Sequence, residues 1–325
     1  MKALISETLA SVNELIATVN HKKDPIVKLY IGGYGPGIFT VGGELTRVAS
    51  PSFLAAHPTL PVLYAAGELE RGRLTAYTTQ GALSPLDERP SEGDSPCHVA
   101  VHPSGSLLAA ANYGDGTASL HRLDERGAFT GDPIVLRHVG SGPDIDRQAG
   151  PHAHQCVFHD DVLHVADLGT DEIRRYRLDG APLDPITLAP GSGPRHLAFD
   201  GDRLYVAGEL DGTVTLVEGE RRTVVPASRD GGQNFPSHLQ LDGDFVYVAN
   251  RGPNTVSVLR AADLSPVAEV PSGGDWPRHF AITGDRLYVA NQKSGEVIVF
   301  TLKDGVPEPA GQAYEVPSPA CVLPV

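Results

Sequence analysis

The sequence predicts an all-β fold, a seven-bladed β-propeller with four-stranded antiparallel blades, and two observations support this prediction. The 325 residues include 36 glycines and 27 prolines, a composition that suits many short strands joined by turns. A proline that opens a strand recurs at intervals of 45, 55, 43, 42, 41 and 42 residues. These prolines are Pro51, Pro96, Pro151, Pro194, Pro236, Pro277 and Pro319. A repeat of about 42 residues with four strands matches a propeller blade.

Each repeat begins with two strands joined by a tight turn. The second strand starts ten to twelve residues after the proline and reads LYAAGEL at 63, LLAAANY at 107, LHVADLG at 163, LYVAGEL at 204, VYVANRG at 246 and LYVANQK at 287. Gly and Asp in the intervening HPSG, DGD and TGD segments favour hairpin turns. Third and fourth strands follow, as TVTLVEG and RRTVVPA show.

The seventh copy is split between the two ends of the chain. Its second strand is LYIGGYG at 29, whereas its first strand is PSPACVLPV at 317–325. We therefore expect the C-terminal strand to be the innermost strand of the blade that the N-terminal strands complete. This pairing would close the ring and leave only short, protected sheet edges.

Residues 1–24 lie outside the repeat, and the propeller is expected over residues 25–325. Apolar residues in the first segment follow 4,3,4,3 spacing: Ile5, Leu9, Val12, Ile16 and Val19. This spacing predicts one amphipathic helix. The helix could dock on the propeller, promote dimerisation or form a frayed extension.

Composition limits the partners and the compartment. A formal charge of -14 argues against nucleic acid, since proteins that bind it present clustered Lys and Arg. No apolar run approaches the length of a membrane helix, and the first 25 residues lack the features of a signal peptide. Cys97, Cys156 and Cys321 are odd in number and are predicted to be buried in strands. We expect a cytoplasmic monomer or homodimer that binds neither nucleic acid nor a membrane.

Polar residues are predicted to gather at one face of the disc. The first two strands of each blade are antiparallel, so the start of the first strand lies beside the end of the second. This geometry brings Arg195 near Glu209, Arg278 near Asn291 and His154 near Asp167. Five histidines at similar points should ring the mouth of the central channel: His98, His154, His196, His238 and His279.

The motifs GPHAHQ, VADLGTDEI, GPRHLAF, LYVAGELDGTV, WPRHF and PSPACV resemble a known family over about residues 27–325. The family is the seven-bladed propeller lactonases of the 6-phosphogluconolactonase type, which includes the fungal carboxymuconate-lactonizing enzymes. The resemblance implies active-site roles for four residues: His154, Arg195, Glu209 and Arg278. This chain has Gly208 where the family usually has Asn, and its N-terminal helix has no counterpart in the typical member.

The chemistry of these residue types agrees with the resemblance. Opening a lactone needs a general base for water and cationic donors for the developing oxyanion. Glu209 or His154 could be the base, and Arg195 and Arg278 could stabilise the oxyanion or anchor an anionic group. Further substrate contacts are expected from residues near the same mouth: His98, His152, Asp167, His196, His238, Asn250, His279 and Asn291.

The expected function is hydrolysis of a small anionic sugar lactone, of the 6-phosphogluconolactone kind. Two alternatives stay open, a cycloisomerase of the muconate-lactonizing type and a non-catalytic propeller that binds a ligand. Side chains at the ends of second strands could in principle converge on Ca²⁺: Asn112, Asp167, Glu209, Asn250 and Asn291. Two arginines and several histidines at the same mouth make a poor cage for a dication, so we expect no metal. Motifs for nucleotide or zinc cofactors are absent from the sequence, so no cofactor is expected.

Overall fold

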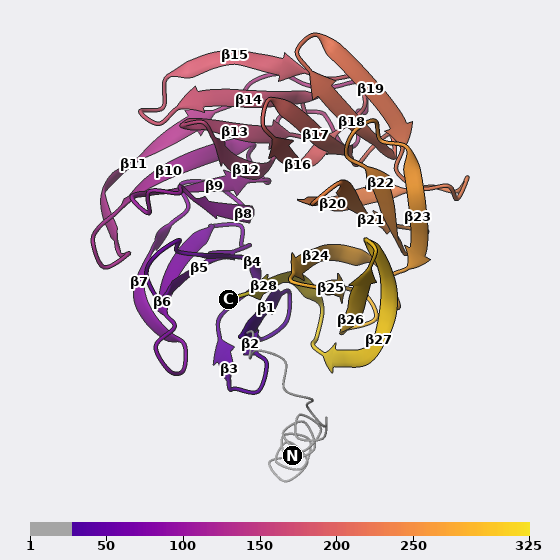
Figure 1. Ribbon diagram of the computed structural model, residues 1–325. Coiled ribbons are helices and arrows are strands. Elements are labelled where there is room, and N and C mark those ends of the chain that lie inside the picture. Colours follow the sequence, from indigo (N-terminus) through magenta and orange to yellow (C-terminus); the bar gives the residue numbers. More distant parts are fainter. Residues whose placement is uncertain (1–27) are drawn as a thin grey trace.

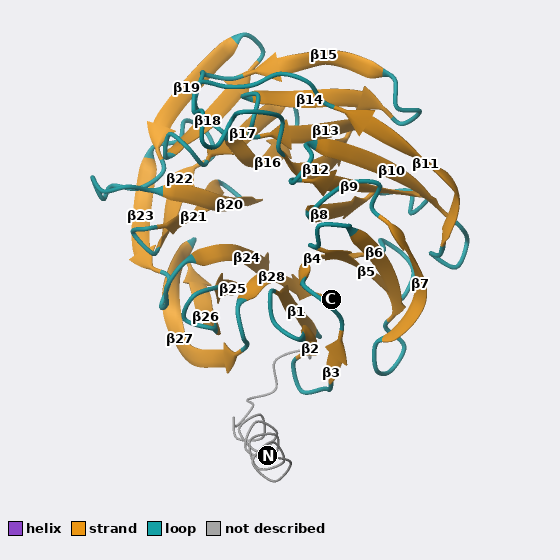
Figure 2. Cartoon of the chain, turned by 180° about the vertical axis from the view of Figure 1, so that it is seen from behind, coloured by secondary structure: helices purple, strands orange, loops and turns teal. Residues whose placement is uncertain are grey.

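The computed structural model describes residues 28–325, which form seven four-stranded antiparallel sheets arranged around a central axis (Figures 1 and 2). The predicted seven-bladed propeller is confirmed. The helix predicted within residues 1–24 lies outside the described residues. In residues 28–325, no helix is long and apolar enough to cross a membrane. The three cysteines are buried and unpaired, as predicted for small core residues.

Each blade has its first strand at the axis and its last strand at the rim. The first two blades, from the axis outward, contain β28 (Pro319–Pro324), β1 (Leu29–Gly33), β2 (Gly37–Thr40) and β3 (Leu45–Arg47), then β4 (Pro51–Ala56), β5 (Val62–Gly67), β6 (Arg73–Thr78) and β7 (Ser84–Pro90). The third and fourth contain β8 (Pro96–Val101), β9 (Leu107–Asn112), β10 (Thr117–Leu123) and β11 (Phe129–Arg137), then β12 (Ala153–His159), β13 (Val162–Asp167), β14 (Glu172–Arg177) and β15 (Pro182–Thr187).

The last three blades follow the same order. The fifth and sixth contain β16 (Pro194–Asp200), β17 (Arg203–Gly208), β18 (Thr213–Glu218) and β19 (Arg221–Pro226), then β20 (Phe235–Asp242), β21 (Phe245–Arg251), β22 (Thr255–Arg260) and β23 (Pro266–Pro271). The seventh contains β24 (Pro277–Thr283), β25 (Arg286–Asn291), β26 (Glu296–Lys303) and β27 (Val306–Glu315).

The ring closes through the first blade, as the split repeat predicted. Strand β28 pairs antiparallel with β1, with Tyr30 opposite Leu323 and Gly32 opposite Cys321. The backbone N–H of Val325 donates a hydrogen bond to the carbonyl of Lys28 at 2.8 Å. Each inner strand also contacts the inner strands of both neighbouring blades. The seven inner strands therefore form the wall of the central channel.

The hydrophobic core is divided into seven clusters, one between each pair of neighbouring blades. Hydrogen bonds cross the same interfaces, because Tyr64, Tyr205 and Tyr247 each donate from the hydroxyl to a carbonyl of the next blade at 2.7–2.8 Å. Every blade needs two neighbours to bury both faces. The arrangement of the seven blades around the channel therefore depends on a complete ring.

Deletion of residues 319–325 should unfold the ring. The deletion removes Cys321 and Val322, which are about 1 % exposed and belong to the two clusters that flank the first blade. Losing each buried side chain of this size costs about 1.5–3 kcal/mol, and the total approaches the roughly 5–15 kcal/mol of a typical domain. Thermal melting followed by circular dichroism measures the effect. A truncated protein that melts with the parent would contradict the closure.

Candidate active site

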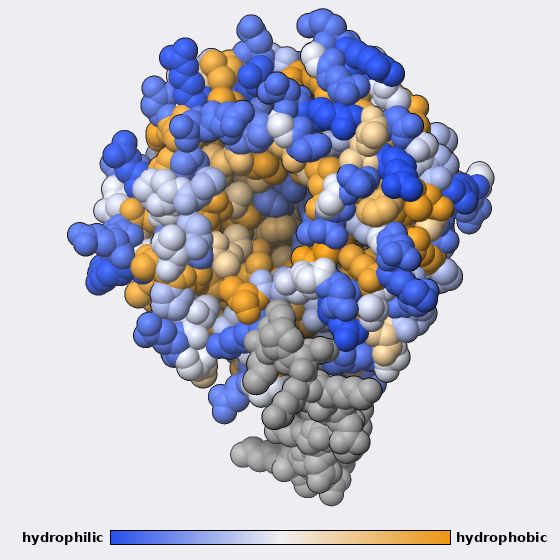
Figure 3. All heavy atoms as spheres, in the orientation of Figure 1, coloured by the Kyte–Doolittle hydropathy of each residue, from blue (hydrophilic) through white to orange (hydrophobic). Residues whose placement is uncertain are grey.

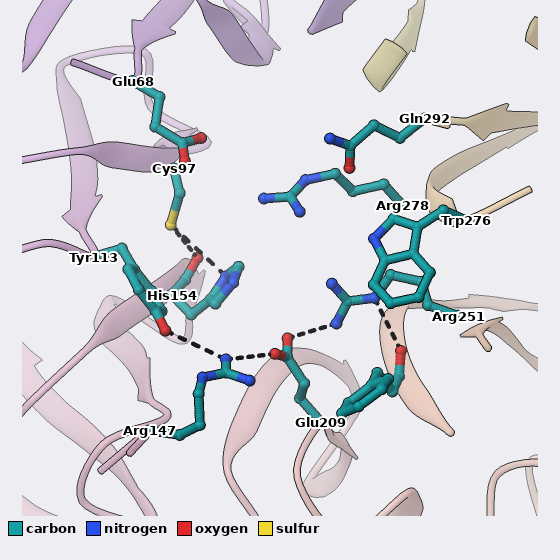
Figure 4. Close-up of a pocket in the computed structure, with 11 residues that line it drawn as sticks. Glu68, Cys97, Tyr113, Arg147, His154, Glu209, Arg251, Trp276, Arg278 and Gln292 are labelled. Carbon is teal, nitrogen blue, oxygen red and sulfur yellow. Dashed lines mark hydrogen bonds and ion pairs between the residues drawn. The ribbon is translucent and has the colours of Figure 1, made fainter. Parts of the chain in front are cut away.

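A cavity of about 350 Å³ lies at the end of the channel where the inner strands begin. The disc is hollowed at its centre (Figure 3), and Figure 4 shows the side chains that face the cavity. They come from six blades and from the loop that precedes β12. The lining residues are Glu68, Cys97, Tyr113, Arg147, His154, Glu209, Phe235, Arg251, Trp276, Arg278 and Gln292.

The first set of site residues comes from β-bulges on the inner strands. All seven inner strands shift register near their start, after the second residue in β20 and after the first residue in the other six. The shift leaves one residue without a partner on the second strand. In β16 both Arg195 and His196 lie in the shift. A bulge re-aims a side chain that would otherwise follow the pleat of the strand. The residues at this position are Ser52, Cys97, His154, Arg195, Ser237, Arg278 and Ala320.

The second set comes from one position at the end of each second strand. In each blade an Asn, Asp or Gly near the end of the second strand pairs with a residue at the start of the inner strand, and the position in question is the next residue along the chain. Around the ring these residues are Tyr34, Glu68, Tyr113, Leu168, Glu209, Arg251 and Gln292. Five of the seven line the cavity, and a sixth, Tyr34, contacts Arg278. Two positions per blade thus supply most of the site.

Glu209 is the centre of a cluster of charged groups (Figure 4). Its Oε1 lies 2.7 Å from Nη2 of Arg147, and its Oε2 lies 2.8 Å from Nε of Arg195 and 2.6 Å from Nη2 of Arg251. The Glu209 side chain is 6 % exposed. Burial alone would raise the pKa of this carboxyl, but the guanidiniums of Arg251 and Arg195 outweigh burial and hold the pKa far below its usual range. Glu209 is therefore ionised at neutral pH and is a weak base.

Arg195 and Arg278 have different surroundings. Arg195 is buried, and besides its contact with Glu209 it donates from Nη1 to the carbonyl of Ser237. Burial, together with the nearby guanidiniums of Arg251 and Arg278, lowers the pKa of Arg195. Its guanidinium stays charged at neutral pH because an arginine starts from a pKa above 12.

Arg278 is held by a tyrosine rather than by a carboxylate. Its Nη2 donates to the hydroxyl of Tyr34 at 2.6 Å, and that hydroxyl donates to Oε2 of Glu68 at 2.8 Å. The guanidinium also lies 5.1 Å from the centre of the Tyr34 ring. In Figure 4 the end of the Arg278 side chain points into the cavity. This arrangement leaves N–H donors of Arg278 directed into the cavity.

His154 lies opposite these arginines as a neutral imidazole. Burial, followed by the charge of Arg195, lowers the pKa of His154 well below 6.5. Nδ1 of the ring is 3.7 Å from Sγ of Cys97, and that thiol donates to the backbone carbonyl of His154 at 3.3 Å. Burial raises the pKa of Cys97, so the sulfur carries its proton. Nε2 of His154 has no hydrogen-bond partner within residues 28–325, and a neutral nitrogen of this kind can accept a proton.

Residues 36–324 match the model of a family described as lactonase, seven-bladed β-propeller. The chain belongs to this family. The 6-phosphogluconolactonase of Bacillus subtilis (strain 168) is 32 % identical over 184 residues, 53 % of this chain and 52 % of that protein. The chain thus spans about half the length of the curated relatives it matches.

Two solved structures show the extent of the structural similarity. The periplasmic gluconolactonase of Pseudomonas aeruginosa is 26 % identical, with a TM-score of 0.84, over 92 % of this chain and 99 % of that one. A protein from Lactobacillus plantarum is 27 % identical, also with a TM-score of 0.84, over 92 % of this chain and all of that one. The similarity therefore extends around the whole lactonase-family propeller.

The ring of five histidines differs from the sequence-based picture. Four of the histidines lie two residues after a strand-opening proline: His98, His196, His238 and His279. The equivalent residue of β12 is Gln155. His154 lies one residue nearer the mouth, in the bulge of β12. None of the four deeper histidines lines the cavity in the described part of the propeller.

The deeper histidines connect neighbouring inner strands. Nδ1 of His98 accepts from the backbone N–H of Cys156 at 3.4 Å, and Nδ1 of His279 accepts from that of Val322 at 3.2 Å. The Nδ1 atoms of His196 and His238 are 2.7 Å apart. Burial lowers the pKa of all four rings. Their geometry supports the channel wall, and ligand contact by them stays a prediction.

Asp167, Asn250 and Asn291 hold the loops that enter each blade. Oδ2 of Asp167 is 2.7 Å from Nδ1 of His138, and its Oδ1 accepts from the backbone N–H of His152. Asn250 and Asn291 donate from Nδ2 to carbonyls of the preceding loops at 3.3 and 3.0 Å. All three are fully buried and lie outside the cavity lining. They hold the loops behind the cavity and do not face it.

His152 lies behind the cavity wall, where its ring stacks on Tyr113 at 4.5 Å between centres. Its Nδ1 donates to the Tyr113 carbonyl at 2.8 Å.

Within the described residues, no group of three His, Cys, Asp or Glu side chains has an arrangement that could hold a metal ion. The absence of a metal cofactor stays a prediction.

Sequence reasoning missed several lining residues, above all Arg147 and Arg251. Arg251 follows VYVAN as Glu209 follows LYVAG, so aligning the second strands would have identified it together with Glu68, Tyr113 and Gln292. Arg147 belongs to the segment that makes the interval between Pro96 and Pro151 the longest of the six. That length was the one signal in the sequence for a loop that reaches the site.

Replacing Glu209 with Gln should destabilise the protein, because three guanidiniums would lose their carboxylate. Breaking a buried ion pair costs about 3–5 kcal/mol, which urea unfolding at pH 7 measures. Glu88→Gln is the control, since the pair of Glu88 with Arg73 is half exposed and is worth less than about 1 kcal/mol. Equal stability of Glu209→Gln and parent would contradict the cluster.

The pH dependence gives a second readout of the same substitution. A carboxyl whose pKa is lowered by folding adds stability above its unfolded pKa, about 4.3 for Glu, and that stability is lost as the pH falls toward the folded pKa. The stability difference between parent and Glu209→Gln should therefore shrink steadily below about pH 4.

Proposed function

We propose that this protein hydrolyses the lactone of an anionic sugar, of the 6-phosphogluconolactone class. The observation that carries the proposal is a neutral histidine that faces a cluster of guanidiniums across one cavity. The name of the B. subtilis relative supports this choice of substrate.

The charge of the cavity favours an anionic ligand. Three guanidiniums and two carboxylates, Glu68 and Glu209, line the cavity, and Arg195 pairs with Glu209 beside it. These six groups carry two net positive charges within a protein of net charge -14. Arg147, Arg195 and Arg251 share the charge of Glu209, whereas Arg278 is neutralised less directly through Tyr34. A local positive focus of this kind raises the concentration of an anionic substrate at the mouth.

His154 is the general base in this proposal. Nε2 takes a proton from a water molecule as the water oxygen bonds to the lactone carbonyl carbon. The bond from that carbon to the ring oxygen then breaks, and the imidazolium returns the proton to the ring oxygen, which becomes a hydroxyl. Both carboxylate oxygens of Glu209 are paired with guanidiniums, whereas Nε2 of His154 has no hydrogen-bond partner within residues 28–325. We therefore assign the base to His154 rather than to Glu209.

Arg278 stabilises the negative charge that develops on the carbonyl oxygen. Its guanidinium points into the cavity on the side opposite His154 (Figure 4), and Tyr34 and Glu68 fix its position. A donor held in place before the reaction costs no reorganisation when the charge appears. Glu209 acts as a positioning residue that orders Arg147, Arg195 and Arg251.

Hydrolysis of 6-phosphogluconolactone, corrected for its spontaneous rate, tests the proposal. His154→Gln should lower kcat by about 10²–10⁴ because it removes the base. Arg278→Ala should lower kcat by about 10²–10³ because it removes one oxyanion donor. His159→Gln, at the opposite end of β12, is the matched control and should keep the parental kcat. EDTA should leave the parental rate unchanged.

The pH profile tests whether a group with a lowered pKa acts as the base. A base works in its deprotonated form, and the pKa of His154 is lowered below 6.5, so kcat/KM should be constant near pH 7 and fall only as the pH decreases well below 6.5. Parental activity in both His154→Gln and Arg278→Ala would overturn the mechanism. A parent that hydrolyses no sugar lactone would overturn the function.

A further inference from the structure

Trp276 has a backbone conformation that a bulky residue rarely adopts. Its φ is +68°, in the left-handed region, and it directly precedes the proline that opens β24. The residue before the inner strand is also left-handed in four other blades, with φ between +46° and +56°. Those blades have small residues there: Ser50, Ser95, Gly193 and Ser318. The seventh blade alone among these five has a large side chain at a position that suits a small one.

The strain is held by hydrogen bonds on both sides of the residue. The backbone N–H of Trp276 donates to Oδ1 of Asn254 at 2.9 Å, and its carbonyl accepts from the N–H of Gln292 at 3.0 Å. A left-handed conformation is strained for a non-glycine residue and persists where its surroundings enforce it. Nothing in the blade geometry requires tryptophan here, since serine meets the same constraint in three other blades.

The conformation places the indole in the cavity wall (Figure 4). Two cations fix the ring: Nζ of Lys293 lies 3.4 Å from its centre, and Cζ of Arg251 lies 5.4 Å away. The ring of Phe235, which also lines the cavity, is 6.0 Å from it. The indole therefore lies in the cavity lining together with Arg251 and Arg278.

We propose that Trp276 is the platform on which the sugar ring of the substrate packs. Sugar rings present C–H groups on one face, and these groups pack on the electron-rich face of an aromatic ring. An anionic substituent on the same ring would reach the adjacent guanidiniums. The inference rests on the proposed function and assigns the ring-binding part of that site.

The chain offers a direct readout, because Trp276 is its single tryptophan. Titration of the full chain with 6-phosphogluconate, the product of the proposed reaction, should change the tryptophan emission in a saturable way. This readout needs no turnover. An emission that stays constant while the parent hydrolyses the lactone with a measurable KM would overturn the platform and leave the proposed function intact.

Substitution gives the second test. Trp276→Ser installs the residue of the equivalent positions and should raise KM for 6-phosphogluconolactone about tenfold, with kcat within about twofold, because the platform binds the substrate and transition state alike. Trp276→Phe keeps an aromatic ring and should keep KM within about threefold; if the serine variant fails to fold, the emission titration of the parent remains the deciding test. Phe245→Leu is the control, at the far end of β21 from Arg251, and should keep the parental KM.

The outcomes distinguish the two claims. Parental KM in Trp276→Ser would overturn the platform alone. A parent that neither hydrolyses the lactone nor responds to 6-phosphogluconate would overturn the proposed function. Emission that responds to cis,cis-muconate and not to 6-phosphogluconate would show that the indole binds a planar acid, and would overturn the sugar assignment.

Discussion

The Glu209 carboxylate brings three guanidiniums, those of Arg147, Arg195 and Arg251, to within 2.6–2.8 Å of its two oxygens. These arginines come from a loop and two blades. Without the carboxylate, their mutual repulsion at low dielectric would open the mouth. With it, the mouth keeps a net positive charge that can attract an anionic ligand. Within residues 28–325, Arg278 has no direct contact with a carboxylate. The ionised state of Glu209 follows from this arrangement, whereas the neutral state of His154 follows first from burial and then from the charge of Arg195.

The propeller builds an asymmetric site from a symmetric scaffold. Every blade presents a bulged residue from its inner strand and one residue from the end of its second strand. Because seven blades repeat the same geometry, a change of side chain at either position alters the site without altering the fold. His154 and Cys97 occupy one side of the cavity, and Arg278 and Trp276 occupy the other. The left-handed backbone of Trp276 shows that placing a large side chain before the inner strand carries a conformational cost in the seventh blade.

Much of the fold could be predicted from the sequence because its signals are local and repeated. Strand-opening prolines and LYVA-type second strands define the blades, and the displaced copy LYIGGYG predicts the pairing of β28 with β1. His154, Arg195, Glu209 and Arg278 were found from motifs. The structure places His154, Glu209 and Arg278 in the cavity lining, and Arg195 is buried beside them in an ion pair with Glu209. The bulges could not be read from the sequence, because they depend on pairing between strands. For that reason the level of His154 was misjudged, and Asp167, Asn250 and Asn291 were expected in a cavity that they support from behind.

The proposed function depends most on the positive charge of the cavity, which would select an anionic sugar lactone. The most direct measurement is kcat/KM of the parent protein for 6-phosphogluconolactone and for the uncharged gluconolactone, over roughly 0.01 to 1 M salt. The phosphorylated substrate should be preferred by at least about tenfold at low salt, and the preference should shrink as the Debye length falls from about 30 to 3 Å. Equal values for the two lactones at every salt concentration would contradict the account.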